Sequence, residues 1–235
     1  MIRMTNYVML YAPIGVFGLI AYTVTRHGLA VLLPLGKLIL TAFIATLIFV
    51  CITYLPIIKL IGMKISDYLK GAFEPWLIAF TTCSSAAALA VNLEASRKMG
   101  ASKAIASFAI PLGNTINMNG TSIYMGVTAV FAAEVFGIDL TLAQQFQIVL
   151  MGVLAAVGTA GVPGAGLIMT TLVFTEVGIP LEAVALIAGI DRILDMIRTS
   201  VNVLGDSLTA LVVSKSEGVL GTELMDQDTV VKEQL

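Results

Sequence analysis

Five long stretches of this chain contain no charged residue, and short charged segments separate them. A helix needs about 20 apolar residues to cross the hydrocarbon core of a bilayer, so stretches of this length indicate helices embedded in a membrane. They cover residues 4–25, 38–58, 75–93, 104–133 and 140–175. The pattern predicts an all-α membrane protein with a first span at about 7–26 and a second at about 36–60.

The third stretch is short, and basic residues lie on both sides of it: Lys64 and Lys70 before, Arg97 and Lys98 after. Basic residues gather on the cytoplasmic side of membrane proteins. A segment with both ends on one side is a re-entrant hairpin, which we expect at 68–100. Its tip would carry Ser84 and Ser85. Packing of small residues between ordinary helices is the alternative explanation of these serines.

Two further stretches contain residues that break helices. The run 113–121, GNTINMNGT, interrupts the span predicted at 104–133, and an ordinary polar kink is the alternative there. The run 158–166, GTAGVPGAG, combines a proline with glycines and ends any helix. Its stretch is flanked by Asp139 and Glu176, which fits a second re-entrant hairpin at 142–177, entered from outside. Oppositely oriented discontinuous segments are typical of inverted repeats in secondary transporters, whose binding site lies at mid-membrane.

The last apolar stretch, predicted as one helix at 183–213, carries a stripe of polar residues. They follow one another at i, i+4, i+7, i+11 and i+15, within an arc of about 80° on one helix face. The stripe comprises Asp191, Asp195, Arg198, Asn202 and Asp206. An ionisable group at membrane depth is unfavourable by roughly 2.5–3.5 kcal/mol on insertion scales. We therefore expect the stripe to face a ligand, an ion path or a partner.

Each member of the stripe suits a different chemical task. Arg198 can bind a carboxylate with two parallel hydrogen bonds, and Asp195 can bind an ammonium group; an internal ion pair of the two without a ligand is the alternative. Asp206 and Asn202 can contribute oxygens to a cage for a hard cation. We interpret Asp191 as a supporting hydrogen-bond partner, and Arg192 as a residue that points away from the stripe.

Composition supports a membrane protein and gives no support for nucleic-acid binding. Of the 235 residues, 58% are hydrophobic and 12% charged, whereas soluble domains carry about 25% charged residues. The net charge of −2 gives no reason to expect nucleic acid. Cys51 and Cys83 read as buried unpaired thiols, and His27 as a loop residue. An aspartyl protease would need Asp191 and Asp195 to share a proton, but the nearby arginine favours ionised carboxylates, so we predict no enzyme.

Four motifs, in order along the chain, resemble the dicarboxylate/amino acid:cation symporters, the glutamate transporter family. They are TTCSSAAALAV (81–91), TINMNGT (115–121), GTAGVPGAG (158–166) and DRILDMIRTSVNVLGD (191–206). The resemblance implies an elevator-type transporter with two re-entrant hairpins in the cell membrane, a homotrimer in its full-length form, and a cytoplasmic C-terminus. It implies symport of L-glutamate or L-aspartate with sodium or protons, and no organic cofactor. Lipid and the small-molecule substrate are the partners implied.

The resemblance also implies roles for individual residues. Those that would contact the substrate are Ser84, Ser85, Thr121, Val162, Gly166, Asp195, Arg198, Thr199 and Asn202. One sodium site would use Gly113, Asn117, Asn202 and Asp206, and another Thr115 with backbone oxygens of Ala156, Val157 and Thr159. Relatives carry an aspartate where this chain has Asn119, so a third cation site would be weakened or lost.

The same resemblance predicts the division of the chain. Residues 1–30 would form a scaffold-like span, 31–214 a transport domain, and 215–235 a cytoplasmic tail. The first four spans of the family would be missing. Three other functions stay open at this point: a C4-dicarboxylate symporter, a neutral amino acid symporter, and a fragment that does not transport.

Overall fold

The computed structural model describes residues 32–222, together with positions 11, 14–15, 17–18, 21–22, 24–25 and 28. Most of the span predicted at 7–26, and the end of the predicted tail from 223, lie outside the described residues. Within the part described, every regular element is a helix. The predicted all-α class is thereby confirmed.

The second predicted span is one helical rod in three parts: α2 (Leu32–Phe49), η2 (Val50–Tyr54) and α3 (Leu55–Leu60). The π-helical part, η2, precedes Pro56 in the first turn of α3. Proline has no N–H and disrupts the hydrogen bond to the preceding turn, and a π-bulge accommodates such a disruption. In the described chain Leu33–Leu60 is the one helix long and apolar enough to cross a membrane. Cys51, predicted to be buried, is exposed on this rod, while Cys83 is buried as predicted.

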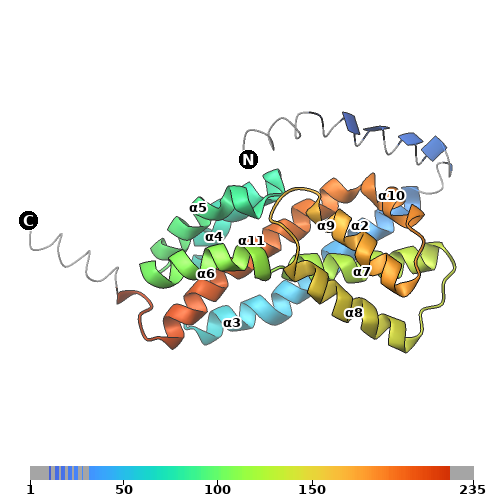
Figure 1. The fold of residues 1–235 in the computed structure, drawn as a ribbon. Helices are drawn as coiled ribbons and strands as arrows, with labels where there is room; N and C mark the ends of the chain where they lie inside the picture. The colour runs from blue at the N-terminus through green and yellow to red at the C-terminus, as the bar shows by residue number, and fades with distance from the viewer. Residues whose placement is uncertain are drawn as a thin grey trace, which may run out of the picture.

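Two pairs of adjacent helices pack against each other as helical hairpins (Figure 1). The first hairpin is α4 (Ile65–Thr82) and α5 (Ser85–Lys98), and the second is α8 (Leu142–Val157) and α9 (Ala165–Val177). Between them lies the broken span, α6 (Lys103–Ile116) and α7 (Asn119–Val135), interrupted at Asn117 and Met118. All three interruptions fall inside the predicted motifs.

The last predicted helix is wrong in one respect. It is two helices, α10 (Glu182–Ala188) and α11 (Asp191–Ser216), separated at Gly189 and Ile190. The break places Asp191 in the first turn of α11, where a carboxylate complements the positive end of the helix dipole. The polar stripe therefore begins at the N-terminus of a helix.

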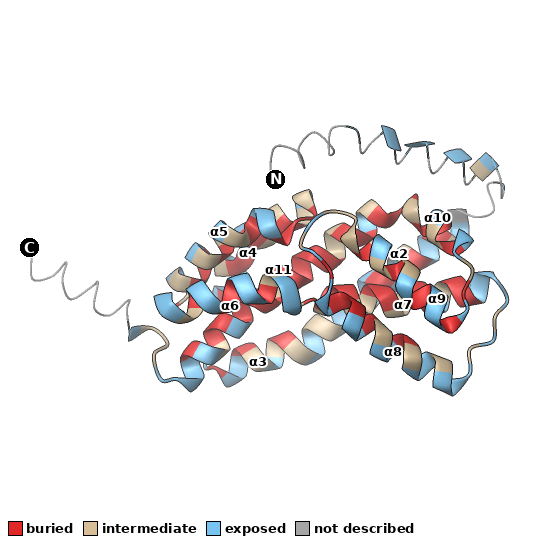
Figure 2. Ribbon diagram, in the orientation of Figure 1, coloured by how far each residue is buried: buried red, intermediate tan, exposed pale blue. Residues whose placement is uncertain are grey.

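Helix α11 runs through the middle of the molecule and packs against α2, α4, α5, α6 and α7. Most of its residues are buried, whereas the outer faces of α6 and α8 are exposed (Figure 2). One apolar cluster joins α2, α7, α8, α9 and α10, and a second joins α3, α4, α6 and the C-terminal half of α11. The polar stripe lies between the two.

The end of α11 is also more tightly packed than the sequence indicates. Ser214 is fully buried, and its Oγ accepts a hydrogen bond from the backbone N–H of Ser102 at 3.1 Å. The backbone N–H of Gly221 donates to the carbonyl of Gly100 at 2.8 Å. Residues 215–218 are exposed, as expected of the predicted tail, and the chain then returns to the turn between α5 and α6 at Gly221.

Candidate functional site

A buried ion pair occupies the centre of the polar stripe. Arg198 donates from Nε and Nη2 to Oδ1 of Asp195 at 3.1 and 3.0 Å, and both side chains are at most 4% exposed. Thr199 donates its hydroxyl to the same Oδ1 at 2.7 Å. The internal pair that the sequence left as an alternative is thus present in this structure.

The loop between α8 and α9, residues 158–164, closes over this ion pair. The backbone N–H of Gly164 donates to Oδ2 of Asp195 at 2.9 Å. A Cβ atom placed on Gly166, in the first turn of α9, would overlap Nη1 of Arg198. Only glycine lets the helix backbone approach the guanidinium this closely. The second hairpin therefore contacts both charges of the pair directly.

One end of the Arg198 guanidinium has no partner within the described structure. Its Nη1 is buried and makes no hydrogen bond. The ring of Tyr124 lies under the guanidinium, with 4.8 Å between the ring centroid and Cζ, and the Tyr124 hydroxyl donates to Asp191 Oδ1 at 2.8 Å. Asp191 is thus a supporting partner, as predicted. A buried donor without an acceptor is unfavourable by about 1–3 kcal/mol, which marks the position beside Nη1 as one where a ligand acceptor would bind well.

The turns of the two hairpins touch each other. Ser84 donates its hydroxyl to the carbonyl of Gly161 at 3.0 Å, and the backbone N–H of Ala86 donates to the same carbonyl at 3.3 Å. Ser85 is 3% exposed, and its Cβ is 3.3 Å from a Cβ placed on Gly161. The buried Oδ1 of Asn114, in α6, lies beside the same glycine and accepts no hydrogen bond. The two turns, which are far apart in the sequence, therefore meet in the middle of the molecule.

Asn202 links the polar stripe to the broken span. Its Oδ1 accepts from the backbone N–H of Gly120 at 2.8 Å, and its Nδ2 donates to the hydroxyl of Thr121 at 3.1 Å. The N-terminus of α7 is thereby fixed one turn from Arg198. Of the predicted substrate residues the structure gathers all but Val162, whose side chain is 45% exposed in the loop.

The first predicted cation set converges around Asp206. Asn117 donates from Nδ2 to Asp206 Oδ1 at 2.9 Å and to the carbonyl of Asn202 at 3.3 Å. A Cβ on Gly113 would meet Oδ1 of Asp206 at 2.5 Å. Asn119 donates from Nδ2 to Asn117 Oδ1 at 2.8 Å and to the hydroxyl of Tyr54 at 3.1 Å. These oxygens lie together, and the amide of Asn119 is a donor among them.

The hydrogen bonds of the described chain do not assemble the second predicted cation set. Thr115 is exposed, and its hydroxyl donates to Leu112 O within α6 at 2.8 Å. Thr159 donates to Ala155 O at the end of α8, at 2.8 Å. Ala156 and Val157 belong to that same helix end. The described residues also contain no cluster of His, Cys, Asp and Glu of the kind that holds a transition metal.

Three aromatic or basic residues have contacts that the sequence reasoning missed. The Tyr54 hydroxyl donates to the carbonyl of Val201 at 3.2 Å, and the Tyr124 hydroxyl donates to Asp191. A buried tyrosine hydroxyl usually has a hydrogen-bond partner, so a tyrosine within an apolar helix indicates such a contact. Arg192 points away from the stripe, as predicted, and reaches the first hairpin. Its guanidinium donates to the carbonyls of Thr81 and Thr82, at 2.6 and 3.4 Å, at the end of α4.

Comparison with known proteins identifies the family. The Sodium:dicarboxylate symporter family matches residues 1–216. The chain is 40% identical to the "Proton/sodium-glutamate symport protein" of Geobacillus stearothermophilus, over 95% of this chain and 53% of that protein. It is 39% identical to the "Proton/glutamate-aspartate symporter" of Escherichia coli (strain K12), over 92% and 50%.

A third relative carries a different substrate in its name. The "C4-dicarboxylate transport protein" of Bacillus subtilis (strain 168) is 38% identical, over 92% of this chain and 51% of that protein. The chain spans about half the length of these curated relatives. The family and the relatives are membrane transporters and not enzymes, as the sequence predicted. With a match over most of its length, this chain belongs to the sodium:dicarboxylate symporter family.

Proposed function

We propose that this chain forms the substrate-binding core of a secondary transporter that imports L-glutamate or L-aspartate together with sodium or protons. The observation that carries the proposal is the arrangement at Arg198. One edge of its guanidinium is paired with Asp195, while the other edge is buried, unpaired and covered by the second hairpin. A ligand carboxylate would complete the hydrogen bonds of the guanidinium.

The ligand that fits both charges is an amino acid with an additional carboxylate. Its side-chain carboxylate would bind Arg198, and its ammonium group would bind Asp195, which now accepts from Gly164 N–H at 2.9 Å. The main-chain carboxylate would lie toward Ser84, Ser85 and Thr121, with Thr199, Asn202 and the Val162–Gly166 turn enclosing it. Binding then requires the loop 158–164 to give up its contact with Asp195.

The coupling cation would bind among the oxygens around Asp206. Gly113, Asn117 and Asn202 supply neutral oxygens, and Asp206 supplies the charge. Asn119 offers no charge and donates to Asn117 Oδ1, which favours fewer coupling cations than an aspartate there would give. Thr115 with Ala156, Val157 and Thr159 forms a second candidate that would assemble only after α6 and α8 shift toward one another.

The transport cycle would use the second hairpin as its outer gate, with both hairpins re-entrant. Cations order the outer hairpin, 142–177, and thereby favour substrate binding, because two ligands that stabilise the same state bind cooperatively. The transport domain then moves inward in an elevator step. We propose that the scaffold for this step comes from residues that the relatives have in their other half, in a homotrimer with a cytoplasmic C-terminus.

A C4-dicarboxylate is the second candidate substrate, and the name of one relative favours it. Asp195 argues against it here. A ligand with two carboxylates would place an anion next to a buried aspartate, and removing the compensation of a buried charge is unfavourable by about 3–5 kcal/mol. Asp195 therefore favours an acidic amino acid, whose ammonium group it would bind, over a C4-dicarboxylate.

Calorimetric titration of the purified chain tests the proposal. L-aspartate and succinate are titrated in sodium chloride and in choline chloride. We expect L-aspartate to bind in sodium and more weakly by at least tenfold in choline, with succinate weaker than L-aspartate in both. Asp206→Asn should abolish the sodium effect, while Asp139→Asn, at an exposed position, should preserve it. Preferential binding of succinate, or no binding of either acid by a folded chain, contradicts the proposed substrate.

The cation count has its own test. In Asn119→Asp a carboxylate replaces the amide that donates to Asn117 Oδ1 and Tyr54, and two acceptors facing one another need a cation between them. The dependence of L-aspartate affinity on sodium concentration should become steeper by about one ion in a log–log plot, since each linked ion adds one to the slope. An unchanged slope would show that Asn119 does not limit coupling.

A further inference from the structure

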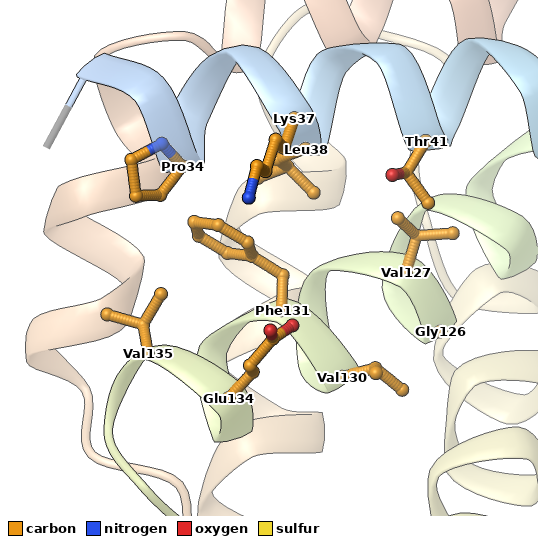
Figure 3. A pocket seen from close by; sticks show the side chains of 10 residues that line it. All are labelled: Pro34, Lys37, Leu38, Thr41, Gly126, Val127, Val130, Phe131, Glu134 and Val135. Atoms are coloured by element: carbon orange, nitrogen blue, oxygen red, sulfur yellow. The ribbon is translucent and has the colours of Figure 1, made fainter.

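A groove separate from the polar stripe lies between α2 and α7. Its volume is about 600 Å³, within the range of pockets that hold small ligands. The lining is mostly apolar and includes Leu38, Val127, Val130 and Phe131 (Figure 3). None of the residues that contact the Asp195–Arg198 pair lines it. The transport mechanism proposed above gives this groove no role.

Two opposite charges face each other at one end of the groove. Lys37 lies in the second turn of α2, and Glu134 lies in the last turn of α7. Both side chains point into the groove in Figure 3, where the ring of Phe131 is seen between them. They form no ion pair with each other, and neither belongs to the ion pairs Glu94–Lys98 and Asp195–Arg198. The groove thus presents one cation and one anion at separate points.

The other end of the groove is apolar and open. Along α7, Gly126 lies two turns from Glu134, a distance of about 12 Å at 1.5 Å per residue. A Cβ atom placed on Gly126 would meet no atom within 4 Å. The charged end lies near the first residues of α2 and the last residues of α7, and the apolar end lies further along the same two helices. Charge and apolar surface are therefore ordered as in a phospholipid.

We propose that the groove binds a zwitterionic phospholipid with a primary amine headgroup, of the phosphatidylethanolamine type. Its phosphate accepts from the ammonium of Lys37, and its own ammonium donates to the carboxylate of Glu134. One acyl chain lies along Leu38, Val127 and Val130 to Gly126, and the rest of the lipid stays in the bilayer.

The pair of charges selects among lipids. Phosphatidylglycerol offers a phosphate to Lys37 but no cation to Glu134, and its negative charge faces that carboxylate. Phosphatidylcholine has a cation without N–H donors, so it cannot hydrogen-bond to Glu134. A fatty acid satisfies Lys37 alone. The amine headgroup is the one of these that satisfies both residues.

Native mass spectrometry of the detergent-solubilised chain, with dioleoyl-phosphatidylethanolamine added at defined ratios, tests the proposal. In Gly126→Leu the new side chain fills the apolar end, and we expect at least a tenfold loss of the tightly bound lipid. Gly36→Leu is the matched control, because Gly36 also has open space around it and lies on α2 away from the groove lining. That control should retain the lipid. Replacing glycine inside a helix generally favours the helix, so neither variant is expected to unfold.

The headgroup assignment is tested by Glu134→Gln. We expect its preference for phosphatidylethanolamine over phosphatidylglycerol to fall about threefold, the size expected of a solvent-accessible charge contact. Equal lipid retention by Gly126→Leu and Gly36→Leu overturns the site. Equal binding of all three phospholipids to the unchanged chain overturns the headgroup assignment. A mass showing that a second copy of the chain, and no lipid, is held through this groove also overturns the proposal.

Discussion

The two hairpins turn back in different ways, although both turns contact α11. The first turns within two residues, Cys83 and Ser84, and Cys83 adopts the left-handed conformation at φ 55°. The second uses the longer loop 158–164, in which Gly164 has φ 76°. A non-glycine residue in the left-handed region persists only where its surroundings hold it. The left-handed conformation in the first turn therefore depends on its contacts, whereas in the second turn glycine adopts it without a steric penalty.

Their contacts with α11 differ in kind. The first turn is held through backbone groups of Thr81 and Thr82, which accept from Arg192, and the thiol of Cys83 faces the Arg192 carbonyl at 3.8 Å. The second turn is held by Asp195 and Arg198 themselves. A ligand that binds these two side chains competes with the second turn only. Under the proposed function, this difference predicts that the second hairpin opens for substrate while the first stays closed.

Gly166→Ala is the change with the largest expected effect. A methyl group at this position overlaps the Arg198 guanidinium, so either α9 or the arginine has to move. We expect calorimetry to show at least a hundredfold loss of L-aspartate affinity. Disturbing a buried ion pair is unfavourable by about 3–5 kcal/mol, and each 1.4 kcal/mol corresponds to about a tenfold change in affinity.

The control for this change lies in the same hairpin. A methyl group on Gly158 would approach the flexible end of Met169 at 3.3 Å, and φ there is −85°. Gly158→Ala should therefore change affinity by less than about threefold. Equal losses in the two variants would show that the second turn is merely intolerant of side chains and does not act through Arg198.

Arg192→Gln should weaken the contacts that hold the first turn and raise the labelling rate of Cys83 by about tenfold. It removes charged hydrogen bonds to two carbonyls, each worth about 1.5–3 kcal/mol when buried and less at this partly exposed site. The measurement is the rate at which a maleimide labels Cys83 in a Cys51→Ser background, because Cys51 is exposed and would react first.

Lys98→Gln serves as the control, since it removes an exposed pair with Glu94 on the same hairpin. It should leave the labelling rate of Cys83 unchanged. If Arg192→Gln also leaves the rate unchanged, Arg192 does not hold the first turn. The proposed difference in how α11 holds the two hairpins would then be wrong for the first hairpin.

The sequence predicted the elements that depend on strong local signals. Proline and glycine at 158–166 and the amides at 113–121 placed the interruptions, and the spacing of Asp191 to Asp206 placed one buried face on α11. The stripe residues do converge because a single helix fixes their relative angles. The proposed roles of these residues in substrate and cation binding stay predictions.

Other features depend on contacts between distant elements, and local patterns do not contain them. Arg192 lies about 100° from Asp191 around the helix, so the stripe gave it no role, yet the first turn approaches from that side. The break at Gly189 was missed because the apolar run continues through it. The burial of Ser214 depends on Ser102, more than one hundred residues earlier. Each required knowledge of which elements pack together.

Ser84→Ala gives the smallest effect and tests where the two turns meet. The Ser84 hydroxyl accepts from Ala87 N–H as the N-cap of α5 and donates to Gly161 O in the second turn. Loss of an N-cap lowers stability by about 1 kcal/mol, and Thr141→Ala gives a matched loss, because Thr141 caps α8 far from the turns. Both variants should lower the melting temperature by similar amounts. Only Ser84→Ala should also raise hydrogen exchange at 158–164, by about fivefold, since it alone removes a contact with that loop.

Equal exchange in the two variants would mean that the second turn is held by Asp195 and Arg198 without help from the first. The two hairpins would then contact the same helix independently, without coupling through their tips.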